Sequence, residues 1–535
     1  MKKYAKITAI LLAASMLCAC EKIPDDPDLS SGAESSVTSS DTSSEQDPDI
    51  YAPNDPVIVK QSYVKKFEAE KGSFNGTARD EYGELQNAEK GGYVALAKGQ
   101  HLTQIATVTT SQFYRVIIAA RSKTGASIKL QIGDSIEGAY FLMRTTVESE
   151  GDEFGLYAVD NIYIPVGMNT LSFTVENGAA DIDYIIIEDS AAVSGSLYNI
   201  GNACVCANAT EKTVLLMRLL AENYGNVTFT AQNVSCGTNA EIDAVYRETK
   251  RYPAIRTGEL ALAMKKDDHS AEVIKNDLAL AREWDSNGGI CSYMWHWYSP
   301  NAVRGTNSED FELYPALNGT DPSELALLDE GGVQLQINND LLTQDAAALL
   351  EDLDKLAQTL KPLCDADIPI LFEPIPDGDS GLFWWGSDAE SYRKLWVLIF
   401  DRLTKYNGIQ NLIWVWNNSD FEYYPGDNYV DIIGQSFYEK TSSSFAGRFG
   451  ALAENPKTGR KAIAVTACAS LPSIDNMSRD NAMWLWAAPD SGEYTIDNTG
   501  RLTEAYTKKS LLRAMYNNRK CITLDELAEL GYVNS

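Results

Sequence analysis

Eight short apolar runs alternate with amphipathic stretches over residues 200–535, and this alternation constrains the fold more than any other feature. Eight strands that alternate with helices predict an α/β fold, a (β/α)8 barrel. Functional residues are then expected just after the carboxyl ends of the strands. The predicted strands are 226–230, 253–255, 289–294, 368–372, 411–416, 430–434, 461–466 and 482–486.

A different pattern occupies residues 56–191. Its runs alternate apolar and polar residues with a period of two and are bounded by Gly, Asn, Asp and Ser, as in 114–120, 127–132 and 169–175. Short strands at such spacing predict an antiparallel β-sandwich in front of the barrel.

The amino terminus carries an export signal. Three lysines precede the apolar stretch 7–17, which is too short to span a bilayer. Residues 1–19 then read as a signal peptide, since Leu17-Cys18-Ala19-Cys20 resembles a bacterial lipobox. The resemblance implies a lipid on Cys20 and a cell-surface lipoprotein held to the membrane by that lipid alone. A plain signal peptide cleaved nearby is the alternative.

Residues 20–55 form a predicted linker. Between 21 and 55 there are eight Ser, ten Asp or Glu and one Lys. Such a composition cannot bury enough apolar surface to offset chain entropy, so the sequence predicts a disordered spacer.

Net charge limits the partners. Lys and Arg number 45 against 75 Asp and Glu, a net charge of -30 that would repel the phosphates of nucleic acid. A neutral polysaccharide remains a suitable partner. The three His residues show no metal-ligand spacing with Cys, so no metal cofactor is expected for the barrel.

All ten Trp fall between residues 284 and 486. Residues two apart in a strand face the same side, so Trp pairs at strand ends predict flat walls for stacking sugar rings in the barrel mouth. The alternative is that these side chains pack the core. The pairs are Trp295 and Trp297, Trp384 and Trp385, Trp414 and Trp416, and Trp484 and Trp486.

Six segments of the barrel unit form a recognisable set: 252–255, 288–297 with Pro300, 383–386, 411–416, 424–434 and 522–527. By these segments the unit resembles the β-mannanases of glycoside hydrolase family 26. This resemblance implies a retaining mechanism, a β-mannan ligand and binding residues among the kept positions. Those are His296, Trp297, Trp384, Trp385, Tyr438, Trp484 and Trp486.

The two catalytic glutamates of that family are replaced in the same alignment. The family's Phe-Arg-Pro-x-His-Glu segment reads Phe372-Glu-Pro-Ile-Pro-Asp377, so Asp377 stands at the acid/base position and Glu373 at the Arg position. The nucleophile position after the seventh strand is Ala467, which cannot form a glycosyl ester.

Three segments of the front module are Phe67-Glu-Ala-Glu70, 91–94 and 183–188. By these segments the module resembles carbohydrate-binding modules of families 35 and 6. The resemblance implies a structural calcium ion held by Glu68, Glu70 and Asp183, a set of oxygen ligands that suits this ion. A folded spacer without a ligand is the alternative.

Three functions follow. The favoured one is a surface-anchored protein that recognises β-mannan or a related β-glycan and is catalytically impaired. The second is an active endo-β-mannanase or β-glycanase with an altered or relocated carboxylate pair drawn from Glu373, Asp377 and Glu439. The third is a structural protein without a glycan ligand.

Overall fold

The computed structural model describes residues 64–530, apart from 81–91, 110–111, 124, 134–137, 144–153, 190–194, 301–304, 439–441, 443 and 456. Cys20, the signal segment 1–19 and the linker 20–55 lie outside the described residues, and so does Glu439. No helix within the described part of the chain is long and apolar enough to cross a membrane.

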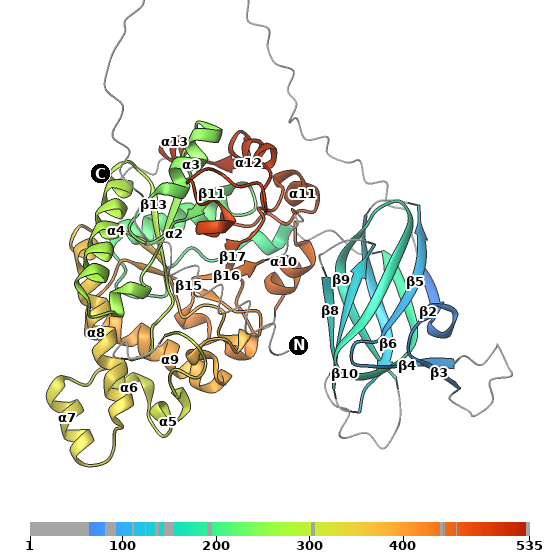
Figure 1. Ribbon diagram of the computed structural model, residues 1–535, viewed down its shortest axis with the longest axis horizontal. Helices are drawn as coiled ribbons and strands as arrows, with labels where there is room; N and C mark the ends of the chain where they lie inside the picture. Colours follow the sequence, from blue (N-terminus) through green and yellow to red (C-terminus); the bar gives the residue numbers. More distant parts are fainter. Residues whose placement is uncertain are drawn as a thin grey trace, which may run out of the picture.

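The front module is antiparallel, as predicted (Figure 1). Its longest strand, β10, has 23 residues; its first half pairs with β5 and β7, and its second half with β1, β4 and β6. Alternate residues of these strands fill an apolar core that includes Leu102, Phe173 and Ile185. The strands are β1 (Val64–Glu68), β2 (Ser73–Phe74), β3 (Thr77–Asp80), β4 (Gly92–Ala97), β5 (His101–Val108), β6 (Gln112–Arg121), β7 (Ala126–Ile132), β8 (Gly138–Met143), β9 (Gly155–Ile164) and β10 (Gly167–Asp189).

The second unit is the predicted (β/α)8 barrel. Eight parallel strands follow one another in order, and β11 closes the barrel by pairing with both β12 and β18. Each of the eight predicted strands overlaps an observed strand, although the second and the last do so only at Ile255 and at Trp486. The strands are β11 (Thr228–Asn233), β12 (Ile255–Glu259), β13 (Ile290–Trp295), β14 (Ile370–Pro374), β15 (Leu412–Asn417), β16 (Ile432–Phe437), β17 (Ala462–Cys468) and β18 (Trp486–Pro489), with β19 (Cys521–Ile522) added beside β11.

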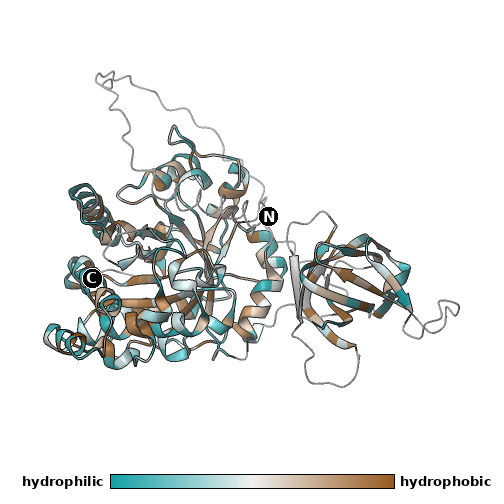
Figure 2. Cartoon of the chain, turned by 60° about the horizontal axis from the view of Figure 1, so that its bottom comes forward, coloured by the Kyte–Doolittle hydropathy of each residue, from teal (hydrophilic) through white to brown (hydrophobic). Residues whose placement is uncertain are grey.

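Helices cover the outside of the barrel, with apolar strands inside and hydrophilic helix surfaces outside (Figure 2). Several helices begin at a side chain that accepts a backbone N–H, as Asp267, Thr343 and Asp388 do. The helices are α2 (Glu211–Asn223), α3 (Ala240–Thr249), α4 (Asp268–Ser286), α5 (Leu313–Leu317), α6 (Pro322–Ala326), α7 (Glu330–Asn338), α8 (Gln344–Asp365), α9 (Ala389–Asp401), α10 (Ala446–Ala453), α11 (Ile474–Arg479), α12 (Lys509–Tyr516) and α13 (Leu524–Glu529).

Candidate active site

A hydrogen-bonded network joins four strands at the mouth of the barrel. Asn417 ends β15, and its Nδ2 donates to Glu373 Oε1 on β14 and to Ser436 Oγ on β16, both at 2.8 Å. The hydroxyl of Thr466 on β17 also donates to Glu373 Oε1, at 3.1 Å. Because parallel strands end at one rim, residues almost a hundred positions apart meet here.

Burial has the largest effect on the pKa of Glu373, whose side chain is only 3% exposed. Loss of solvation raises its pKa to about 8, although the hydrogen bonds from Asn417 and Thr466 favour the charged form. The nearby Asp377 adds like-charge repulsion. Glu373 is therefore a mostly protonated carboxylic acid at neutral pH.

Asp377 stands just above this network. Its backbone is in the left-handed region (φ 51°), and its N–H donates to the carbonyl of Asn417 at 2.9 Å. Burial raises its pKa to about 6, while His296 and a hydrogen bond from Ser436 favour the carboxylate. Asp377 thus titrates well below Glu373.

His296 carries the positive charge of the mouth. Its Nδ1 donates to Glu259 Oε2 at 2.6 Å, where β12 ends. Burial disfavours the imidazolium, but the attraction and the hydrogen bond of Glu259 outweigh it and raise the pKa of His296 to about 9. His296 is therefore cationic at neutral pH, and Asp377 and Glu373 lie within its electrostatic reach.

The end of β17 contributes no carboxylate. A bulge shifts the register between β16 and β17, and Ala467 stands opposite Ser436. Ala467 is 3% exposed and lies outside the main apolar cluster of the barrel. On the far side of the mouth, Tyr438 Oη donates to Asp490 Oδ2 at 2.9 Å, next to the end of β18.

Aromatic rings line the mouth in two groups. Phe383 is half-buried and stacks on Trp385 with ring centroids 4.5 Å apart and planes 5° apart. His296 lies 5.6 Å from Phe383. Opposite them, the Tyr438 ring is 5.5 Å from Tyr494. Tyr494 in turn is 4.9 Å from Tyr506, a row that leads away from Asp490.

Several of these residues escaped the sequence analysis. Glu259 and Asp490 mark the ends of β12 and β18, so the expectation that functional groups follow strand ends could have found them. Tyr494 ends a short 3-10 helix and Tyr506 lies in a loop, so neither carries such a signal, whereas Phe383 belongs to the matching segment 383–386 but was not singled out.

The prediction that paired Trp side chains form open walls of the mouth is wrong. All eight are at most 2% exposed. Residues two apart do share a face, but on β13 and β15 it is the face that the helices cover. Trp297 Nε1 donates to Asp352 on α8, and Trp414 packs on Trp396 and Phe400 of α9. Both faces of a strand in this fold are buried, so alternation alone could not distinguish them.

The sequence also predicts Trp484 and Trp486 at the mouth, and this prediction is wrong. Both lie at the amino end of β18, opposite the mouth. Trp484 Nε1 donates to the carbonyl of Ser444, and its ring packs on Phe449 of α10. Of the predicted binding set, His296, Trp385 and Tyr438 belong to the mouth, while Trp384 is enclosed and donates to the carbonyl of Trp297.

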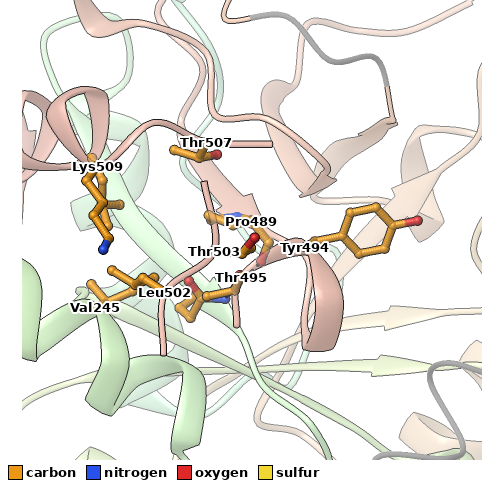
Figure 3. A pocket seen from close by; sticks show the side chains of 10 residues that line it. Val245, Pro489, Tyr494, Thr495, Leu502, Thr503, Thr507 and Lys509 are labelled. Carbon is orange, nitrogen blue, oxygen red and sulfur yellow. Dashed lines mark hydrogen bonds between the residues drawn. The ribbon is translucent and has the colours of Figure 1, made fainter. Parts of the chain in front are cut away.

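A small cavity lies beside the mouth, between α3, α12 and the loop after β18 (Figure 3). Its volume is about 10 Å³, room for a single water molecule and far too little for a sugar ring. The cavity is lined by Gln232, Val245, Pro489, Tyr494, Thr495, Leu502, Thr503, Thr507, Lys509 and Leu512.

The implied calcium ligands are only partly arranged for a cation. Glu70 Oε2 is buried without a hydrogen-bond partner, as a metal ligand would be without its ion. Glu68 instead pairs with Lys66 at 3.2 Å. Among the described residues no three His, Cys, Asp or Glu side chains converge on one point, so the set with Asp183 stays a prediction.

The barrel holds buried carboxyl groups at the carboxyl ends of its strands, where barrel enzymes, glycoside hydrolases among them, place their functional groups. Residues 205–526 match the model of glycosyl hydrolase family 26, and the chain belongs to this family.

Among curated relatives, a mannan endo-1,4-beta-mannosidase of Thermothelomyces thermophilus is 31% identical over 252 residues, 45% of this chain. The match spans only about half of that relative, 46% of its length. Mannan endo-1,4-beta-mannosidase B of Piromyces sp is 24% identical over 89% of this chain and 80% of its own length.

Two solved structures share the fold. A ruminal endo-beta-1,4-mannanase of the family aligns over 88% of this chain and 99% of its own, with a TM-score of 0.59 and 21% identity. The GH26-CBM35 beta-(1,4)-mannanase of Podospora anserina aligns over 87% of this chain and 99% of its own, with a TM-score of 0.54 and 23% identity.

Proposed function

We propose that this protein recognises β-mannan or a related neutral β-glycan in the barrel mouth and hydrolyses it poorly or not at all. One observation carries the proposal. Ala467 ends the bulged strand β17 opposite Ser436, so that strand offers a methyl group where the retaining mechanism needs a carboxylate.

The rest of the mouth supports a glycan ligand. The half-buried ring of Phe383, supported from behind by Trp385, and the half-buried rings of Tyr438 and Tyr506, which both contact Tyr494, offer apolar surface on two sides of a polar centre. Sugar rings combine such faces with hydroxyl groups that need charged or polar partners. His296, Asp377 and Asp490 are suitable partners. We place the protein at the cell surface, anchored through Cys20.

The test combines binding and hydrolysis on the chain from residue 21 onward. Mannan, glucomannan and galactomannan are incubated with micromolar protein for a day, and both retention on the polymer and new reducing ends are measured. Binding without product is the expected result. Phe383→Ala should then weaken binding, whereas Tyr246→Ala, which removes a partly exposed ring on the outer helix α3, should leave binding unchanged. Product formation at enzyme-like rates would contradict the proposal.

Hydrolysis by an altered pair is a second candidate, and the different pKa values of two carboxyl groups favour it. Glu373, with a pKa of about 8, would be the acid and Asp377, with a pKa of about 6, the carboxylate. If product forms, Glu373→Gln and Asp377→Asn should each abolish it, and a bell-shaped pH profile should result.

A further inference from the structure

A groove runs along the outside of the barrel between α4 and α8, and it begins at the segment that follows β12. We call it the α4/α8 groove. Its volume is about 490 Å³, enough for several side chains of a bound segment. It is lined by Leu262, Ala263, Lys265, Ala271, Ile274, Lys275, Leu278, Ala279, Arg282, Lys355, Gln358, Thr359 and Pro362.

The α4/α8 groove is basic, whereas the chain as a whole is acidic. Four of its residues are Lys or Arg and none is Asp or Glu, although the chain carries a net charge of -30. Its floor is apolar, with Ile274 and Leu278 buried beneath the basic residues. No aromatic ring lines the groove, so it lacks the platform that a neutral sugar would need.

The basic side chains are only partly neutralised. Lys275 pairs at 3.6 Å with Glu272, but both side chains are more than 70% exposed, so this pair is weak. Lys355 Nζ donates to the carbonyl of Lys265. Arg282 makes no hydrogen bond or ion pair to any residue that the structure describes. Positive charge along two turns of α4 is therefore available to an anionic ligand.

The chain itself contains a matching anionic segment. Residues 21–55 hold ten Asp or Glu against one Lys, together with scattered apolar residues such as Ile23, Leu29 and Ile50. The 43 positions from residue 21 to the start of β1 can span at most about 150 Å when fully extended. The segment is therefore long enough to reach the barrel from the front module, and the covalent tether makes its binding intramolecular.

We propose that residues 21–55 bind in the α4/α8 groove of the same chain, with carboxylates on Lys275, Arg282 and Lys355 and apolar side chains on the floor. Binding there draws the linker along the barrel instead of leaving it extended. Because the contacts are ionic and near the surface, salt weakens them, since the Debye length falls from about 10 Å at 0.1 M to about 3 Å at 1 M.

Carbodiimide crosslinking of the whole chain from residue 21 tests this proposal. The reagent joins a carboxylate to a lysine amine only at contact distance, and peptide mass spectrometry locates the bond. We expect crosslinks from residues 21–55 to Lys275 and Lys355. Arg282→Glu and 1 M NaCl should each reduce them at least fivefold. Arg218→Glu is the matched control. This arginine on α2 is likewise exposed and makes no hydrogen bond or ion pair to any residue that the structure describes.

Three outcomes would overturn the proposal. The first is that no such crosslink forms. The second is that the crosslinks spread equally to exposed lysines outside the groove, such as Lys361 on α8. The third is that mixed isotope-labelled and unlabelled protein gives only crosslinks between two copies. Mannan binding, measured on the same variants, should not change, so this result is independent of the function proposed for the mouth.

Discussion

The side-chain amide of Asn417 donates to the carboxyl group of Glu373 at 2.8 Å and thereby ties β15 to β14 inside the barrel. The acid that receives this bond is buried and has a pKa of about 8. A group of this kind makes folding depend on pH, because the unfolded chain can ionise it at pH values where the folded chain cannot.

We therefore expect Glu373→Gln to stabilise the protein in alkaline solution. Below pH 4.5 the wild-type group is protonated in both states, and its contribution is fully present. As pH rises to about 8 the unfolded state gains by ionising, at about 1.4 kcal/mol per pKa unit, so the wild type loses stability. Urea denaturation at pH 4 and pH 8.5 measures the difference, which should appear only at pH 8.5. Glu272→Gln, on an exposed residue, should show no such dependence.

His296 should titrate far above an ordinary histidine. The ion pair with Glu259 raises its pKa to about 9 against the cost of burial. This pair stabilises the fold fully below pH 6.5, and its contribution is lost as pH rises toward 9. The chain has three His, so imidazole resonances are readily assigned by NMR. Glu259→Gln should bring the pKa of His296 below 7; an unchanged value would show that Glu259 is not the cause.

The buried pair of Arg256 and Asp277 should be important for stability. Their side chains are 1% exposed and 2.7 Å apart, and Tyr293 also donates to Asp277 at 2.8 Å. Asp277→Asn leaves a buried guanidinium without its counter-charge, which costs about 3–5 kcal/mol. Tyr293→Phe removes one hydrogen bond and should cost about 1 kcal/mol. Urea denaturation gives both values; equal effects would contradict this ordering.

Removing an aromatic side chain from the core should lower stability, whereas removing one from the mouth should weaken mannan binding. Trp414 is fully buried against Trp396 and Phe400, so Trp414→Ala should cost about 3–5 kcal/mol of stability. Phe383 is half-buried at the mouth, and Phe383→Ala should weaken mannan binding at a smaller cost in stability. Affinity electrophoresis in mannan gels, at a temperature where both variants are folded, separates the two effects. Weaker binding by Trp414→Ala alone would restore the idea of Trp walls.

The barrel was predictable because its signal is repeated eight times, so an error at one strand does not change the fold. The site was less predictable. The alternation of side chains along a strand predicts that Trp414 and Trp416 share a face, but it does not predict whether helices or solvent cover that face. His296 was predicted from the resemblance of its segment to glycoside hydrolase family 26, whereas its partner Glu259 was not predicted. The two residues are 37 positions apart, and they meet only because β12 and β13 lie side by side.

The loss of the nucleophile can be tested by restoring it. If Ala467 and Asp377 hold the positions of the two catalytic glutamates, then Ala467→Glu with Asp377→Glu should create hydrolysis, at least about 100-fold above the wild type. Glu373 would limit this gain, because it lacks the positive charge that the family's Arg at this position supplies to keep a neighbouring carboxylate ionised. Adding Glu373→Arg should therefore increase the rate further. Reducing-end assays on mannan measure each variant.

The rate of mannan hydrolysis should rise from the wild type to the variant with Ala467→Glu and Asp377→Glu, and rise again when Glu373→Arg is added. The control is Ala467→Gln with Asp377→Glu, which has the same size and shape as the restored pair but no nucleophilic oxygen anion, and it should be inactive. If the glutamine variant were as active as the glutamate variant, the carboxylate at 467 would have no role in bond cleavage. If the wild type were already as active as the restored variants, Glu373 and Asp377 would themselves be the working pair, since they are the two carboxyl groups whose pKa values the mouth separates.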